Sequence, residues 1–171
     1  MLVIVFWPEQ KMEITNKLTS SEYDYFMEEV TVHQYDQLGN QANKMMAKRM
    51  EHTDENMTSY LSSPLIVYKN SNQGNWLIYS DKGILIEGKQ LELLDRVLIK
   101  EESSEGKTIT QLDTSNLFIN LEKDKAKTQE VVTIKNPSFL TKAVGMEIDF
   151  TNEKFFLKSQ VESEIYQTKV N

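Results

Sequence analysis

The chain has no cysteine among its 171 residues, and it has only 6 glycines and 3 prolines. The absence of cysteine excludes disulfide bridges, thiolate metal sites and thiol catalysis. The scarcity of glycine and proline excludes collagen-like and low-complexity chains, and a hydrophobic fraction of 39% is enough for a packed core. A chain of this length is expected to form one domain.

Clusters of positive charge are also missing. The 19 lysines and arginines are scattered among 26 aspartates and glutamates, which gives a net charge of −7. A protein that binds nucleic acid needs basic residues gathered on one face to neutralise phosphates. We therefore expect no nucleic-acid partner.

Catalytic signatures are absent as well. The sequence contains no GxSxG elbow, no P-loop and no dinucleotide fingerprint. Its two histidines, His33 and His52, are far apart, and Glu51, His52 and Asp54 lack the second histidine or helical spacing of a metal site. The sequence predicts no catalytic residues, no metal ligands and no cofactor, so we expect a protein that is not an enzyme.

Long hydrophobic runs are limited to Met1–Trp7, which is too short for a membrane helix of about 20 residues. The run has two readings: a buried first strand, or the end of a membrane helix that begins upstream and leaves the bilayer at Trp7 and Pro8. The predicted organisation is an apolar stub at 1–8, a polar linker at 9–24, a β-domain at 25–166 and a tail at 167–171.

Alternation of apolar and polar residues is the dominant pattern that is present. In Gly145–Val161, Met146, Ile148 and Phe150 alternate with charged residues, and Phe155 and Leu157 do so after a polar turn. This period of two is typical of strands that have one buried and one solvent-exposed face. The segment is predicted to form a β-hairpin.

Two earlier segments repeat this hairpin. Asn116–Ile119 and Gly83–Ile86 match its first strand. The return strands share one spacing: Phe155, Leu157 and Val161 correspond to Ala126, Thr128 and Val132, and to Leu91, Leu93 and Val97. Recurrence of a similar unit every roughly 20–50 residues indicates a β-architecture built by stacking such units.

The N-terminal half adds further strands. Tyr25–Tyr35 alternates with Val30 and Val32 inward, and Gly39 supplies a turn. Gln41–Glu51 is rich in helix-forming residues, but it also alternates, and the turn before it favours a strand. Thr58–Tyr68 and Trp76–Tyr79 complete a prediction of about a dozen short antiparallel strands.

Inward residues of such a folded sheet either fill a core or line a groove, and the periodicity of the sequence does not distinguish between a core and a groove. The predicted inward residues, offered as candidates for lining an apolar groove, are Val30, Val32, Met45, Ala47, Leu65, Val67, Ile84, Ile86, Leu93, Val97, Leu117, Ile119, Val132, Met146, Ile148, Phe150, Phe155 and Leu157.

Several phrases, in order and spacing, resemble the LptC family, the membrane-anchored periplasmic component of lipopolysaccharide export. They are YLSSPLIVY at 60–68, WLIYSDKG at 76–83, LEL at 91–93 with Val97, TSNL at 114–117 with VTI at 132–134, and Gly145–Met146 with Leu157, Val161 and Tyr166. The resemblance covers about residues 25–166. It implies a twisted, open antiparallel β-jellyroll with an apolar groove.

The same resemblance implies partners. The lipid A acyl chains of lipopolysaccharide would pass along the groove, from the LptB–LptF–LptG transporter at Tyr25–Tyr35 to the bridge protein LptA at Gly145–Val161. It also implies an inner-membrane protein with a single-pass anchor, of which Met1–Trp7 would be the end, the first part being missing from this sequence. Two alternatives stay open: a soluble LptA-type bridge protein, and a carbohydrate-binding or adhesive β-domain with a packed core and exposed aromatic residues on one face.

Overall fold

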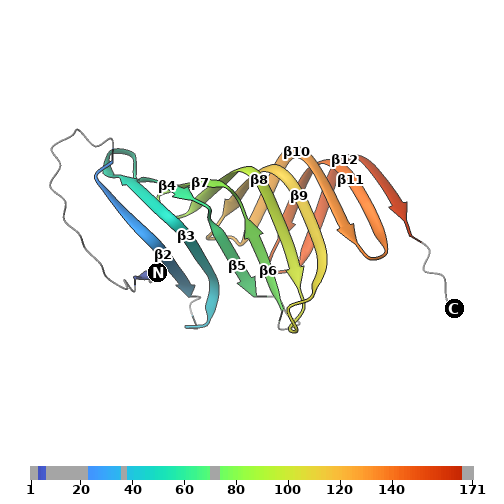
Figure 1. Ribbon diagram of the computed structural model, residues 1–171, viewed down its shortest axis with the longest axis horizontal. Coiled ribbons are helices and arrows are strands. Elements are labelled where there is room, and N and C mark those ends of the chain that lie inside the picture. Colours follow the sequence, from blue (N-terminus) through green and yellow to red (C-terminus); the bar gives the residue numbers. More distant parts are fainter. Residues whose placement is uncertain (1–3, 7–22, 36–37, 70–73, 167–171) are drawn as a thin grey trace.

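The structure is a computed structural model that describes residues 4–6, 23–35, 38–69 and 74–166. Within these ranges, twelve strands form one antiparallel sheet, and a 3-10 turn lies at Asp54–Asn56 (Figure 1). The all-β prediction is confirmed. The strands are β1 Ile4–Phe6, β2 Tyr25–Tyr35, β3 Gln41–Thr53, β4 Thr58–Ser62, β5 Leu65–Lys69, β6 Asn75–Tyr79, β7 Lys82–Ile86, β8 Gln90–Glu102, β9 Thr108–Asn120, β10 Lys125–Asn136, β11 Phe139–Asp149 and β12 Lys154–Ile165.

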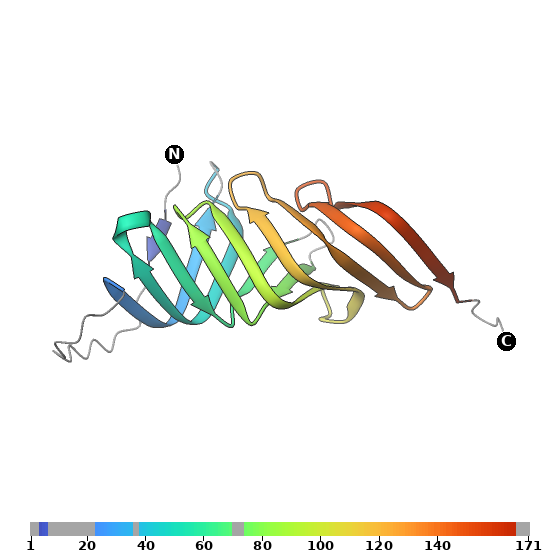
Figure 2. The same ribbon diagram turned by 90° about the horizontal axis from the view of Figure 1, so that it is seen from above.

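The strands follow one another along the long axis of the molecule, from β2 at one end to β12 at the other (Figures 1 and 2). The main order is β1-β2-β3-β4-β7-β8-β9-β10-β11-β12. β5 and β6 lie beside this path, because β5 pairs with β3 and β6, and β6 pairs with β8. Each of the long strands β3 and β8 therefore has two short partners in succession.

This pairing divides the sheet into two layers. Layer A contains β4 and β7 and those parts of the long strands that lie in line with the pairing of β4 and β7. Layer B contains β5 and β6 and the other parts of the long strands. A long strand such as β8 runs through both layers, with 90–94 in layer A and 97–102 in layer B. Seven of the described strands have 11 to 13 residues. β2 has the predicted bounds, whereas the other six extend beyond the short segments predicted for them.

The strands bend where they pass from one layer to the other. Residues with positive φ mark this corner in β2, β8, β11 and β12 and in the β4–β5 link: Glu29, Ser63, Asp95, Arg96, Gly145 and Gln160. The pairing register shifts at the same places, between Leu94 and Val97 and again in β10 and β12. An extra residue of this kind is a β-bulge, which bends a strand and increases its twist.

The apolar faces of the two layers enclose the core. Leu91 and Leu93 are fully buried in layer A, and Ile99 is equally buried in layer B. The four-residue step seen in the sequence between Leu93 and Val97 crosses the bulged corner, which is why both residues point inward. Gln41–Glu51 lies within β3, so the prediction of a strand there is confirmed.

Four predicted inward residues lie on the outer faces instead: Leu65, Val67, Ile84 and Ile86. In β5 the buried residues are Ile66 and Tyr68, and in β7 Gly83 and Leu85 face the core. The prediction for β7 aligned Gly83 with Gly145. Gly145 has a φ of +79° at the corner, where the inward phase changes by one residue, whereas Gly83 lies in regular strand. A slip of one residue exchanges the two faces of a strand.

Part of the predicted N-terminal stub forms a strand. Ile4, Val5 and Phe6 pair with Gln34, His33 and Val32 of β2. Most of the predicted linker and the whole predicted tail lie outside the described residues. Within the described ranges, no helix is long and apolar enough to cross a membrane.

The assignment of Ile66 to the core and Leu65 to the outer face of β5 can be tested directly. We expect Ile66→Ala to lower the free energy of unfolding by about 2–5 kcal/mol, because it leaves a cavity in the core. The matched change Leu65→Ala, on the outer face, should cost about 1 kcal/mol or less. Urea denaturation of both variants measures the difference, and an equal loss in the two would contradict the assigned phase.

Candidate functional site

The interior between the two layers is the candidate site, and most of the predicted lining residues face it. Eleven are buried: Val30, Met45, Ala47, Leu93, Val97, Leu117, Ile119, Val132, Met146, Ile148 and Phe150. Val32 and Leu157 are partly buried and pack against the same core, and Phe155 faces inward but is 40% exposed. Leu65, Val67, Ile84 and Ile86 are not part of it.

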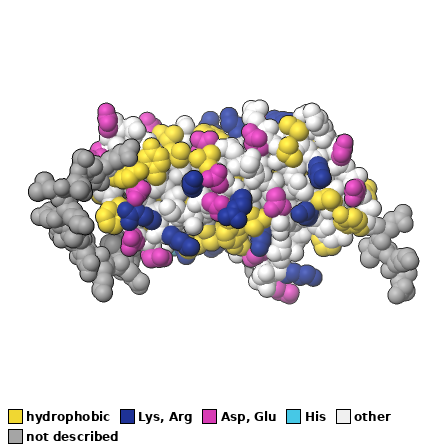
Figure 3. Space-filling view, turned by 45° about the horizontal axis from the view of Figure 1, so that its top comes forward, with side chains coloured by type: hydrophobic (Ala, Val, Ile, Leu, Met, Phe, Trp, Pro, Cys, Tyr) yellow, Lys and Arg dark blue, Asp and Glu magenta, His cyan; other side chains and the backbone are white. Residues whose placement is uncertain are grey.

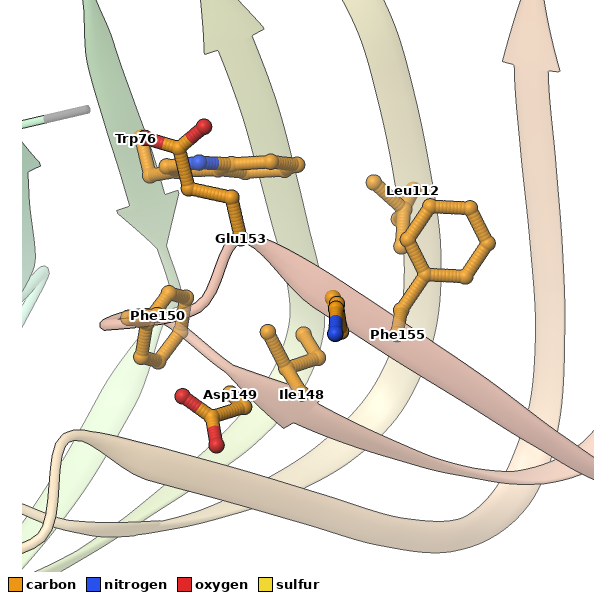
Figure 4. Close-up of a pocket in the computed structure, with 8 residues that line it drawn as sticks. Trp76, Leu112, Ile148, Asp149, Phe150, Glu153 and Phe155 are labelled. Atoms are coloured by element: carbon orange, nitrogen blue, oxygen red, sulfur yellow. The ribbon is translucent and has the colours of Figure 1, made fainter. Parts of the chain in front are cut away.

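Side chains from the two layers meet across this interior. The ring of Tyr68 in layer B stacks on Phe150 at the end of layer A, with centroids 4.3 Å apart and an angle of 9° between the rings. A narrow pocket nearby is lined by Trp76 and Leu112 of layer B and by residues of the β11–β12 hairpin, and it leaves no room for a water molecule. Figure 4 shows these side chains, which come from β6, β9, β11, β12 and the hairpin turn. In this conformation the interior is a filled core.

The layers meet a second time along the side opposite the corner. We call this line the seam and define it by Gln34, Asn43, Tyr68 and Trp76 of layer B and by Leu121, Asp124 and Phe150 in the turns that end layer A. Asn43 Nδ2 donates to Gln34 Oε1 at 2.9 Å, and Gln34 Nε2 donates to the Leu121 carbonyl at 3.2 Å. The two turns are joined by the Phe150 N–H, which donates to the Asp124 carbonyl at 2.9 Å.

The seam holds buried polar atoms without hydrogen-bond partners. In the described part of the chain these include Tyr68 OH, Trp76 Nε1 and Asp124 Oδ1. Burial raises the pKa of the Tyr68 phenol far above its ordinary value, and the charge of Asp124 adds to the effect. Burial also raises the pKa of the Asp124 carboxyl, followed by the charge of Asp149. Buried polar atoms are normally paired. Three of the four unpaired ones among the described residues lie in the seam, and the fourth is Thr114 Oγ1 in β9.

The interior is uncovered at the β12 end. Phe155 faces inward opposite Ile148, and Ile165 faces inward opposite Phe139. Yet Phe155, Val161 and Ile165 are 40, 52 and 79% exposed, because no described strand lies beyond β12 to cover them. The apolar inner surface therefore continues to an open sheet edge.

The β2 end is partly covered. β1 pairs with residues 32–34 of β2, and within the described ranges no strand pairs with the outer edge of β2 between Tyr25 and Thr31. Val30 is buried there, while Tyr25 is 46% exposed and stacks on His52 with centroids 4.7 Å apart. Unpaired backbone groups at such an edge can accept a further strand.

The outer face carries charged residues with hydrophobic side chains in separate patches between them (Figure 3). Phe26, Tyr60 and Phe156 are exposed on the outer face of layer A. Phe26 is on β2 and Phe156 on β12, at opposite ends of the sheet. A hollow of about 240 Å³ lies beside Phe118 and Phe156, and charged residues, among them Lys127 and Glu147, also line it. Tyr60 contacts Tyr23, with ring centroids 5.9 Å apart, at the β2 end of the sheet, whereas Phe156 lies at the β12 end.

The histidines take structural roles. His52 Nδ1 lies 2.8 Å from Ser59 Oγ and its Nε2 lies 3.2 Å from Asp54, while Glu51 binds Arg49. His33 Nδ1 lies 3.2 Å from Gln41 Oε1. Among the described residues, no group of three or more potential ligands could hold a metal ion.

Comparison with known proteins identifies the family. The model of the LptC family, described as "Lipopolysaccharide-assembly, LptC-related", matches residues 1–167. The chain therefore belongs to the LptC family, which supports a role in lipopolysaccharide transport. No curated protein matches the sequence.

Sequence reasoning missed the seam residues Tyr68, Trp76 and Asp124. Tyr68 lies near the end of β5 and Trp76 near the start of β6, and the alternation of β5 was assigned to the wrong face. A signal was present, because Ile66 and Tyr68 alternate as well as Leu65 and Val67 do. Asp124 follows Glu122 and Lys123 in a charged turn, where a solvated carboxylate is the ordinary expectation, but it is partly buried.

The buried carboxyl of Asp124 makes stability depend on pH. Its pKa is raised in the folded state, so the folded state binds the proton more tightly and gains stability as pH falls from neutral through the raised pKa. We expect Asp124→Asn to raise the melting temperature at pH 7, and the gain over the parent protein to shrink as pH approaches the ordinary value of 3.8.

Asp95→Asn is the matched control, since Asp95 and Asp124 both have positive φ, which asparagine also tolerates. The Asp95 side chain is exposed and pairs with Lys82, so its replacement should give no gain at pH 7. Thermal melts monitored by circular dichroism between pH 4 and pH 7 compare the two variants. A gain for Asp124→Asn that does not change with pH would contradict the role of its charge.

Proposed function

We propose that this chain receives lipopolysaccharide from an inner-membrane transporter and passes it to a periplasmic bridge protein. The acyl chains are held inside the fold during this passage. The observation that carries the proposal is the apolar inner surface that runs from β2 to β12 and stays uncovered at β12. Adjacent strands lie about 4.8 Å apart, so the nine strands of the main path from β2 to β12 extend this surface over roughly 40 Å. Membership of the LptC family supports the same role.

Energetics favour passive passage through such an interior. Each buried methylene gains about 0.8 kcal/mol, so a chain of about twelve carbons gains roughly 10 kcal/mol on leaving water. When the layers separate around an acyl chain, contacts between apolar side chains are exchanged for contacts with the lipid. Leucine, isoleucine and methionine make no directional bonds that would hold the chain at one depth. The work of moving the lipid then comes from the transporter.

The two ends of the sheet suit different partners. We place the LptB–LptF–LptG transporter at β2, whose edge is partly unpaired, and LptA at β12, where a further strand would extend the sheet and cover Phe155, Val161 and Ile165. The domain would lie in the periplasm, held at the inner membrane by a single-pass anchor on its N-terminal side. Family membership supports this location.

Two alternatives are less well supported. A soluble LptA-type bridge protein shares the predicted fold, but the matching family is LptC. A carbohydrate-binding β-domain should bring its exposed aromatic residues close together on one face. Here Phe26 and Phe156 share a face but lie on opposite terminal strands.

Photo-crosslinking tests the lipid path. With a photoreactive amino acid at Leu117, Ile148 or Phe155, we expect lipopolysaccharide adducts in cells, because these residues face the interior. Glu147 and Ile84, on the outer face of the same layer, are the controls and should give none. Adducts at neither set would leave a structural β-domain as the better interpretation.

The β12 edge is tested separately. We expect Val161→Asp to leave the fold intact, because Val161 is 52% exposed, and to weaken LptA binding by about tenfold or more, because a charge would enter an apolar contact. The control Glu162→Lys changes charge on the outer face of the same strand. Binding measured by biolayer interferometry that is equal for both variants would place the bridge protein elsewhere.

A further inference from the structure

Three seam residues that carry unpaired polar atoms lie near one another, although Asp124 is far from Tyr68 and Trp76 in the sequence. Tyr68 and Trp76 are direct neighbours across β5 and β6. Asp124 is close enough to Tyr68 to influence its phenol, and its carbonyl accepts from the N–H of Phe150, whose ring covers Tyr68. Tyr68 OH, Trp76 Nε1 and Asp124 Oδ1 are all buried without a hydrogen-bond partner. Leaving polar atoms unpaired lowers stability, so the folded protein alone does not account for them.

The chemistry of the three atoms selects a class of ligand. The indole N–H donates, the carboxylate accepts, and the phenol does both. Hydroxyl groups of a sugar can satisfy all three, and aromatic rings favour the apolar faces of sugar rings. A phosphate fits less well, because Asp124 and Asp149 bring negative charge to this place and Lys125 is already paired with Asp149 at 3.4 Å.

The position of the three atoms is equally specific. They lie where the open sides of layers A and B meet, opposite the bulged corner, and the buried interior begins directly beneath them. Phe150 closes this place from the β11–β12 turn. That turn is held to its own layer, since Asn152 donates to Asp149 at 2.9 and 3.0 Å. Lifting the turn therefore uncovers Tyr68 without unfolding the hairpin. Full separation of the layers also requires the hydrogen bond from Gln34 to the Leu121 carbonyl to open.

We propose that the seam is a lateral gate and a sugar head-group site: Phe150 lifts from Tyr68, acyl chains enter sideways, and Tyr68, Trp76 and Asp124 bind hydroxyls of the head group. The inference rests on the proposed function, in which the interior takes acyl chains. It adds a route through the side of the fold and names the residues that hold the polar part of the lipid.

Two amphiphiles with the same chain length separate head-group binding from chain binding. Dodecyl maltoside carries a sugar head group, and lauryldimethylamine oxide carries none; both are used below their critical micelle concentrations. The sequence has two tryptophans, so Trp7→Phe makes Trp76 the single reporter. We expect both amphiphiles, and lipopolysaccharide, to shift the emission of Trp76 to longer wavelength as the seam opens.

Tyr68→Phe is the decisive variant. It removes an unpartnered hydroxyl, so the melting temperature should stay the same or rise, while the Kd for dodecyl maltoside should increase at least fivefold and that for lauryldimethylamine oxide should not change. Tyr79→Phe removes a phenol from the outer face of layer B and should change neither. Phe150→Leu, which loses the stack but keeps an apolar side chain, should increase the rate of lipopolysaccharide binding severalfold.

The outcomes distinguish this proposal from the proposed function. Unchanged dodecyl maltoside binding in Tyr68→Phe overturns the head-group site. Lipopolysaccharide crosslinks at Leu117 without a shift in Trp76 emission show loading through the ends of the sheet and overturn the gate, but leave the proposed function in place. Absence of crosslinks at every inward residue overturns the proposed function itself.

Discussion

The fold depends on one constraint: a single sheet must bury its own apolar face, since the described part of the chain supplies no helix or second sheet to cover it. Bending each long strand at a bulge satisfies this constraint, because the apolar face of one half of the strand then packs toward the apolar face of the other half. Residues with positive φ at the corner, such as Ser63 and Gln160, are locally unfavourable. They persist because the burial of Leu93, Ile99 and their neighbours on both sides of the corner compensates for them.

The corner also explains how far sequence reasoning reached. The spacing of Leu91, Leu93 and Val97, repeated twice, indicated stacked hairpins because the bulge recurs at the same point of each return strand. Alternation within β2, β3 and the last hairpin gave the inward residues correctly. It failed for Ile84 and Leu65, because a strand with apolar residues on both faces has no contrast between them, and the alignment of Gly83 with Gly145 chose the wrong phase.

The seam was beyond sequence reasoning for a different reason. Gln34 and Leu121 are 87 residues apart in the chain, and their contact depends on the strand order and on the angle between the layers. Periodicity describes the faces of one strand at a time and contains neither quantity. In the sequence, Tyr68 and Trp76 are ordinary strand residues. Only the three-dimensional structure shows that they are neighbours and that Phe150 of the β11–β12 turn covers Tyr68.

The bulged corner has a mechanical consequence. Within each layer the strands are joined by continuous ladders of backbone hydrogen bonds, so the molecule resists extension and shear along its long axis. At the corner those ladders are already interrupted, and a change in the angle between the layers does not need to break them. We therefore expect the domain to be stiffer along its length than across its width, a property that suits the proposed passage of acyl chains between the layers.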